Sequence, residues 1–200
     1  MGRTMQGTNI MIVGVGGQGT LLASRVIGAA AIKAGFDVKV SEVHGMSQRG
    51  GSVVTYVRFG QEVASPLIDK GDADIILSFE ALEALRFLDY LTPDGTLIAN
   101  EQQIDPMPVI TGSESYPDGI IDTLSKGPIH TVTLDAAQIA HDCGDLRAVN
   151  IVLIGVMAAH NLCPITADMW REAVKNCVPP KALDINLRAF EQGYERGGKR

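Results

Sequence analysis

Short apolar runs alternate with amphipathic segments through the first two thirds of the chain. Ile10 to Val13 is apolar at every position, which is typical of a strand buried on both faces of a parallel sheet. Thr20 to Ala34 follows with apolar residues at helical spacing, and Gly35 is a natural left-handed stop. Asp37 to Val43 alternates and predicts a second strand. This order predicts a doubly wound, Rossmann-like α/β fold.

The middle of the chain continues the pattern. It predicts strands at Ser52 to Phe59, Ala73 to Ser78, Thr96 to Ala99 and Ile129 to Leu134, and helices at Glu80 to Leu91, Ile120 to Leu124 and Ala136 to Cys143. Gly60 to Glu62 is a plausible tight turn into Val63 to Ser65, which predicts an antiparallel hairpin, and Pro93 to Gly95 predicts another turn. We therefore expect a mostly parallel sheet with one antiparallel hairpin. Four apolar residues should be buried in central strands: Val13, Val40, Ile76 and Ile98.

The last third of the chain contains only helical patterns. Leu146 to Asn161 is apolar almost all round, so it must be covered all round, either within this domain or in part by a partner. Thr166 to Cys177 and Lys181 to Tyr194 are ordinary amphipathic helices. We expect a single domain over residues 1–200, with a flexible start at 1–8 and a flexible end at 196–200.

Composition and charge exclude several classes of partner. The formal net charge is −6 and no basic block precedes the last few residues, so we expect no nucleic-acid partner. The most apolar helical segment, Val149 to Ala159, is too short to span a bilayer, so no membrane association is expected. The cysteines at 143, 163 and 177 contain no C-x-x-C and cannot form an iron–sulfur or zinc site alone, so we expect no metal site and a reducing, cytoplasmic location.

The turn after the first strand carries glycines at 14, 16 and 19 in the G-x-G-x-x-G spacing, with Gly17 and Gln18 between them. Such a turn permits close approach of a bound group, and the N–H groups at the following helix start favour an anion. Gly14, Gly16, Gly17, Gln18 and Gly19 are therefore candidate cofactor-binding residues. The alternative is that these glycines only let the strand and the helix pack closely, because this motif alone is a weak signal.

A second group of candidates follows the second strand, in the loop from His44 to Gly51. It combines His44, Ser47, Gln48 and Arg49 with three glycines, which is suitable for a site or for a contact surface. The histidine can act as an acid or a base near neutral pH, and the arginine can pair with a carboxylate or a phosphate. Because both loops leave carboxyl ends of strands, we expect them to lie close together.

These two motifs together resemble the γ subunit, or γ domain, of the 2-oxoacid:ferredoxin oxidoreductases. The glycine turn is similar to the start of that family, and Glu42 to Val53 resembles its second motif, in the version found in the indolepyruvate branch. Three further stretches agree: Asp72 to Glu80, Asn150 to Gly155 and Asn186 to Gly193. The resemblance covers essentially the whole chain.

The resemblance implies an accessory subunit of a complex that oxidatively decarboxylates arylpyruvates with coenzyme A to arylacetyl-CoA and reduces ferredoxin. It implies that thiamine diphosphate, Mg²⁺ and iron–sulfur clusters are carried by a larger partner subunit, and that this chain binds no cofactor tightly. Gly71-Asp72-Ala73 is the nearest approach to a thiamine-site Gly-Asp-Gly and does not match it. His44 and Arg49 are candidate catalytic residues of a shared active site, and Ser47 and Gln48 are candidate cofactor contacts.

Three alternatives remain open at this point. The loop from His44 to Gly51 can serve docking instead of catalysis. The chain can be the γ subunit of an enzyme for pyruvate or 2-oxoglutarate. It can also be a free-standing dinucleotide- or flavin-binding domain. In isolation the chain is expected to self-associate or to be poorly stable, because uncovered apolar surface seeks cover.

Overall fold

The structure is a computed structural model, which describes residues 7–44 and 51–198. Within these residues one six-stranded sheet has the order β2-β3-β1-β4-β5-β6. The strands are β1 (Thr8–Val15), β2 (Asp37–His44), β3 (Ser52–Gly60), β4 (Ala73–Ser78), β5 (Leu91–Asn100) and β6 (His130–Leu134). The helices are α1 (Thr20–Lys33), α2 (Ala81–Arg86), α3 (Met107–Ile110), α4 (Ile120–Lys126), α5 (Ala136–Asp142), α6 (Val149–Ala159), α7 (Ala167–Cys177) and α8 (Leu183–Gly197).

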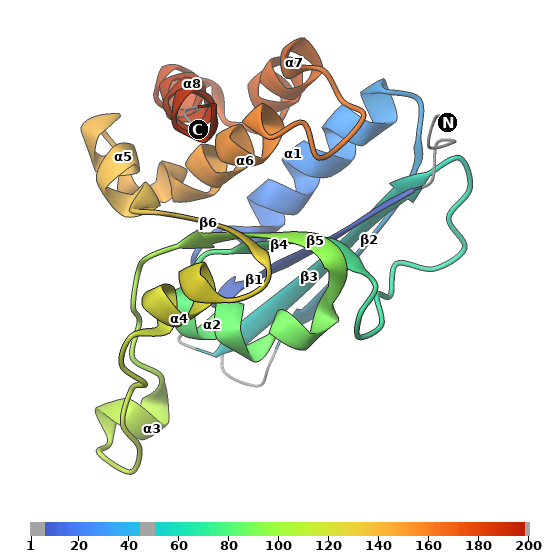
Figure 1. Cartoon of the computed structure of the whole chain (residues 1–200). Coiled ribbons are helices and arrows are strands. Elements are labelled where there is room, and N and C mark those ends of the chain that lie inside the picture. The colour runs from blue at the N-terminus through green and yellow to red at the C-terminus, as the bar shows by residue number, and fades with distance from the viewer. Residues whose placement is uncertain (1–6, 45–50, 199–200) are drawn as a thin grey trace.

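The predicted α/β class is confirmed, with a mostly parallel sheet, one antiparallel hairpin and a helical final third. β1, β4, β5 and β6 pair in parallel, whereas β3 pairs antiparallel with both β1 and β2. Helices α1 and α5 to α8 cover one face of the sheet, and α2 and α4 cover the other (Figure 1). In the described residues no helix is long and apolar enough to cross a membrane.

The antiparallel hairpin is not where the sequence pattern placed it. Residues Val63 to Ser65 form no strand, and the hairpin joins β2 to β3 instead. The reason is that β3 already has a hydrogen-bonded neighbour on each edge, so no edge remains for a third strand. The predicted turn at Pro93 to Gly95 lies inside β5, at an irregularity in its pairing with β4. Ala73 of β4 pairs with Leu91 and Ile75 pairs with Thr96, so the register shifts between these two pairs.

Three of the four strand residues expected in the core are fully buried, namely Val13, Ile76 and Ile98. The prediction for Val40 is wrong, since 44% of this residue is exposed. Its strand, β2, is the edge of the sheet and pairs only with β3. An edge strand at the margin of the helical layer leaves part of its apolar face open to solvent.

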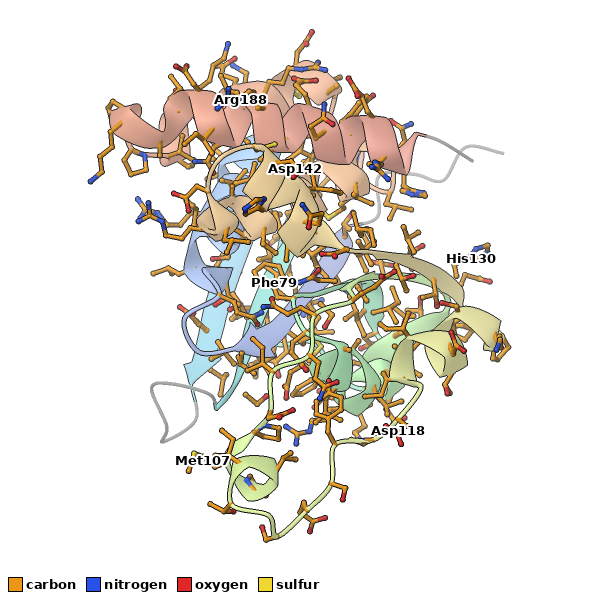
Figure 2. All side chains as sticks on the ribbon, turned by 90° about the vertical axis from the view of Figure 1, so that its left-hand side faces the viewer. Phe79, Met107, Asp118, His130, Asp142 and Arg188 are labelled. Atoms are coloured by element: carbon orange, nitrogen blue, oxygen red, sulfur yellow. The ribbon has the colours of Figure 1, made fainter. Side chains whose placement is uncertain are left out.

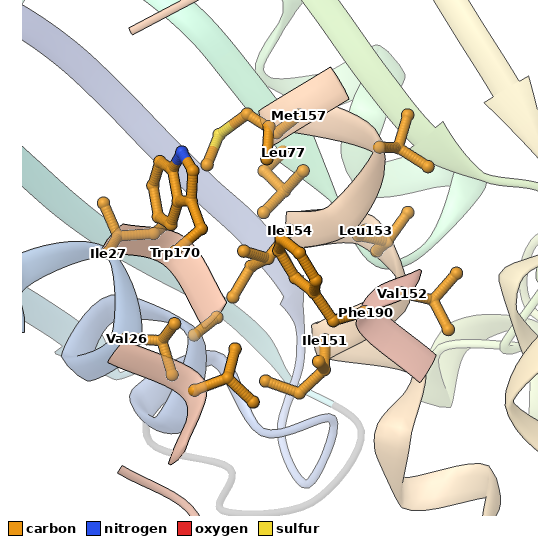
Figure 3. Packing of buried hydrophobic residues seen from close by; sticks show 14 of the residues in the cluster. Val26, Ile27, Leu77, Ile151, Val152, Leu153, Ile154, Met157, Trp170 and Phe190 are labelled. Carbon is orange, nitrogen blue, oxygen red and sulfur yellow. The ribbon is translucent and has the colours of Figure 1, made fainter. Parts of the chain in front are cut away.

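The helix that is apolar all round is covered within this chain. Every residue of α6 from Asn150 to Ala158 is buried, so of the two alternatives left open by the sequence, the structure shows cover within this domain. Figure 3 shows Ile151, Ile154 and Met157 among the side chains of α1, α7 and α8, with Trp170 and Phe190 beside them.

Parts of the expected flexible ends belong to regular secondary structure. Thr8 begins β1 and pairs with Phe59 of β3. Helix α8 continues to Gly197.

Candidate functional site

The glycine turn meets Gly51, the last residue of the loop after β2, at one edge of the sheet. β1 ends at Val15, and Gly19, with φ of 82°, precedes the first residue of α1, Thr20. The Gly16 N–H donates to the carbonyl oxygen of Gly51 at 2.9 Å. The end of the second motif is therefore hydrogen-bonded directly to the first.

The glycine turn lies where the chain connections of the sheet diverge. From β1 the chain crosses to β2 over one face through α1, and from β4 it crosses to β5 over the other face through α2. Neighbouring parallel strands whose connections leave in opposite directions form a crevice at their carboxyl ends, where α/β proteins commonly bind ligands. The site expected from the sequence is thus at the topologically favoured place.

This crevice is bridged by a side chain of the turn itself. Gln18 Oε1 accepts from the Val15 N–H at 2.8 Å, and Gln18 Nε2 donates to the Phe79 carbonyl oxygen at 2.9 Å. A Cβ atom on Gly14 would approach Gln18 Oε1 to 2.7 Å and the Phe79 Cβ atom to 3.1 Å. Gly14 therefore provides the space that the Gln18 carboxamide occupies.

Asn150 of α6 closes the other end of the turn. Its Nδ2 atom donates to the Gly19 carbonyl oxygen at 3.1 Å, and a Cβ atom on Gly19 would lie 2.6 Å from the same nitrogen. Gly19 has positive φ as well, so a side chain there would be strained on two counts. Gly17 has φ of 101° but open space around it, so only its conformation demands glycine.

Several N–H groups that a phosphate would need are already used within the chain. The Val15 N–H binds Gln18 Oε1, the Gly16 N–H binds the Gly51 oxygen, and the Gln18 N–H donates to the Val15 oxygen at 3.3 Å. A phosphate-binding turn keeps such donors free for its ligand. The geometry therefore favours the close-packing role of Gly14 and Gly19 over the binding of a dinucleotide.

An amide cluster extends the bridge to β5, and sequence reasoning did not find it. Asn100 is fully buried; its Nδ2 atom donates to the Phe79 oxygen at 3.1 Å, and its Oδ1 atom accepts from the Ala136 N–H at 3.0 Å. Gln102 Oε1 lies 3.4 Å from Gln18 Nε2. A polar residue directly after the apolar run of β5 is the signal that could have identified Asn100.

Glu83 is a second residue that the sequence analysis missed. Only 2% of its surface is exposed, yet it faces Ser52, the residue that follows the loop. Glu83 Oε2 accepts from Ser52 Oγ at 2.5 Å, and Glu83 Oε1 accepts from Arg86 Nη1 at 2.7 Å. Burial raises the pKa of the Glu83 carboxyl above its usual value of 4.5, and the bonds from Ser52 and Arg86 oppose this only in part.

The raised pKa of Glu83 predicts a pH-dependent effect of Glu83→Gln. A carboxyl whose folded-state pKa is raised stabilises the fold fully below pH 4.5, and this contribution is lost as pH rises through the folded-state pKa. Glutamine does not titrate, so the variant should gain stability relative to the wild type between acid and neutral pH. Urea unfolding of both proteins at several pH values measures the difference. A difference independent of pH would show that burial does not disfavour the Glu83 carboxylate.

The structure locates only part of the second candidate group. The backbone of His44 ends β2 opposite Val53. Ser47, Gln48 and Arg49 lie outside the described residues.

The chain therefore contains a Rossmann-like α/β domain whose favoured ligand crevice is bridged by its own carboxamide side chains. The chain belongs to the pyruvate ferredoxin/flavodoxin oxidoreductase family, whose model matches residues 9–196.

Its relatives include the indolepyruvate oxidoreductase subunits IorB of two organisms. The protein of Pyrococcus horikoshii is 43% identical over 196 residues, and that of Thermococcus kodakarensis is 42% identical over 198 residues; the alignments cover 96% of this chain and 96% of each relative. The solved structure of 2-oxoglutarate:ferredoxin oxidoreductase from Magnetococcus marinus, with 2-oxoglutarate, coenzyme A and succinyl-CoA bound, contains the same fold. Its TM-score is 0.71 at 22% identity, over 97% of this chain and 31% of that chain.

Proposed function

We propose that the chain is the accessory subunit of an indolepyruvate:ferredoxin oxidoreductase. The complex would oxidatively decarboxylate arylpyruvates with coenzyme A to arylacetyl-CoA and reduce ferredoxin. The observation that carries this proposal is the near-full-length similarity to two subunits with that name.

The described residues do not fit the metal cofactors of such a complex. They contain no group of three or more histidine, cysteine, aspartate or glutamate residues that could hold a metal ion. Cys143 and Cys163 are buried, and burial raises the pKa of both thiols, whereas cluster ligands are thiolates. We therefore assign thiamine diphosphate, Mg²⁺, the iron–sulfur clusters and the ferredoxin contact to a larger subunit. The free cysteines also suit a reducing cytoplasm.

For this chain we propose a contribution to a shared active site at the edge formed by the glycine turn and the loop after β2. His44 would exchange a proton and Arg49 would hold a carboxylate or a phosphate, with Ser47 and Gln48 contacting coenzyme A or thiamine diphosphate. Gly14, Gly16, Gly17, Gln18 and Gly19 would form the wall of that site. The bond between Gly16 and Gly51 supports this proposal, because it keeps the two motifs together. Docking against the larger subunit is the competing role for the same loop.

Reconstitution tests the proposed function. The chain is purified alone and together with the larger subunit from the same source, and the reduction of viologen is followed with coenzyme A and indolepyruvate, pyruvate or 2-oxoglutarate. We expect turnover only when both subunits are present, with the highest kcat/KM for indolepyruvate. Preference for another 2-oxoacid would assign the chain to a different branch of the family. Tight stoichiometric binding of NAD or flavin by the isolated chain, measured by calorimetry, would favour the free-standing domain instead.

A further inference from the structure

One segment of the chain projects away from the body of the molecule. We call it the arm: residues 101–119, which leave the end of β5 and return to the N-terminal end of α4. Its helix α3 has no buried residue and stands apart from the sheet and its covering helices in both views (Figures 1 and 2). Met107 is 56% exposed and Ile110 is 65% exposed. The tip of the arm therefore presents large apolar side chains that this chain leaves uncovered.

The tip of the arm is held in one conformation by local bonds. Thr111 Oγ1 donates to the Met107 oxygen at 3.0 Å, and the Ser113 hydroxyl and N–H donate to the Pro108 oxygen at 3.0 and 2.9 Å. Pro106 and Pro108 restrict the backbone further. A preorganised tip loses little conformational entropy on binding, which favours recognition of a partner.

A buried carboxylate, that of Glu80, binds both ends of the base of the arm. Glu80 is 1% exposed; its Oε1 atom accepts from Tyr116 Oη at 2.5 Å and from the Ile104 N–H at 3.1 Å. Tyr116 Oη also accepts from the Leu82 N–H at 3.1 Å. Burial, followed by the bond to Glu80, raises the pKa of Tyr116, so its hydroxyl stays protonated as a donor. Both ends of the arm are thus held at α2, and the tip cannot fold back freely.

The start of the arm also touches the candidate site. Gln102 is the residue whose Oε1 atom approaches Gln18, and its carbonyl oxygen accepts from the Ala81 N–H at 2.9 Å. A partner that holds the arm is therefore brought to the edge of the sheet that carries the glycine turn.

The charge of the arm indicates which kind of partner can bind it. Residues 87–125 contain no lysine, arginine or histidine. Acidic residues flank the uncharged tip, at Asp105 on one side and Glu114 and Asp118 on the other. A second copy of this chain would present the same acidic arm and the same net charge of −6, so self-association through the arm is disfavoured. An apolar slot with a basic rim is complementary.

We propose that the arm is a docking element that inserts Met107 and Ile110 into an apolar, basic-rimmed slot on the larger subunit. This inference rests on the proposed function, because it takes its partner from there. It adds the surface that binds this partner and the two residues that anchor it. The loop after β2 is then free to serve the shared active site.

The experiment measures binding of the purified chain to the immobilised larger subunit from the same source. Met107→Ser and Ile110→Ser should each weaken binding about tenfold to hundredfold, the loss expected when a buried apolar side chain is removed. The matched control is Ile32→Ser, in the last turn of α1 and far from the arm, where the isoleucine is 64% exposed. Circular dichroism confirms that all three variants are folded.

The outcomes separate the arm from the proposed function. Failure of the wild-type chain to bind the larger subunit overturns the proposed function. Wild-type binding that Met107→Ser and Ile110→Ser leave unchanged, or that Ile32→Ser weakens equally, overturns the docking role of the arm alone. Asp105→Asn combined with Glu114→Gln should make binding less sensitive to salt. An unchanged salt dependence would contradict the proposal that basic residues surround the slot. A dimer of the isolated chain that Ile110→Ser dissociates would make a second copy the occupant.

Discussion

Gly193→Ala is expected to destabilise the chain by about 3 kcal/mol or more, at or above the upper end for overpacked cores. Gly193 lies in α8, where a Cβ atom would come closer than 3.0 Å to the carbonyl oxygen of Val152 in α6. The contact is reciprocal, since a Cβ atom on Gly155 of α6 would clash in the same way with the Phe190 oxygen of α8. Backbone atoms cannot rotate away as side chains do, so the two helices would have to separate. Urea unfolding followed by circular dichroism measures the loss.

Gly28→Ala is the matched control, because Gly28 also lies inside a helix and is also buried. The nearest atom to an added Cβ is Val38 Cγ1 at 3.7 Å, an ordinary contact distance. Replacing a helical glycine by alanine then favours the helix by about 1 kcal/mol. The two variants should therefore change stability in opposite directions. Equal tolerance of both would show that α6 and α8 do not pack backbone against backbone.

Arg49→Lys and His44→Ala are expected to lower arylpyruvate turnover of the reconstituted complex by about tenfold to hundredfold. The estimate corresponds to losing one charge-assisted hydrogen bond of about 1.5–3 kcal/mol in the transition state. Lysine keeps the charge but cannot copy the fork of guanidinium donors, so Arg49→Lys tests geometry and not charge. Steady-state viologen reduction gives the turnover, and gel filtration of the complex reports assembly.

Arg147→Lys is the control for this pair, because the Arg147 side chain is 89% exposed and pairs locally with Asp145. It should leave turnover unchanged. Full activity of both loop variants would end the active-site proposal for the loop. Loss of co-elution with the larger subunit, at unchanged fold, would make the loop a docking element.

The sequence pattern predicts most of the order of elements, because most strands and helices carry a strong local signal, but it adds a strand at Val63 to Ser65 and misses α3. The buried run before Val13 and the helix start at Thr20 follow from periodicity alone. The position of β2 does not, because strand order depends on which edges remain free after pairing. The pattern therefore predicts Val40 in the core, although its strand forms the edge of the sheet and the residue is partly exposed.

The location of the candidate site could be predicted from the sequence, but the side chains that occupy it could not. The spacing of the glycines predicts the turn between β1 and α1, and the described ends of the second motif, His44 and Gly51, lie at the same edge of the sheet. What sequence could not give is the filling of the crevice, since Gln18 reaches Phe79 across 61 positions of the chain and Asn150 reaches Gly19 across 131. Glu83 could not be identified as a site residue for the same reason, because only the fold brings it to Ser52.

The packing of α6 against α8 has a consequence for synthesis of the protein on the ribosome. α6 leaves the exit tunnel before α8, yet α8 supplies much of its cover and touches it backbone to backbone. Until α8 has emerged, the nascent chain presents an apolar helix that the sheet, α1 and α5 cover only in part, a surface that attracts chaperones or other unfinished chains. The body of the domain must therefore close after α8 has been translated, and stable pairing with another subunit has to follow that event.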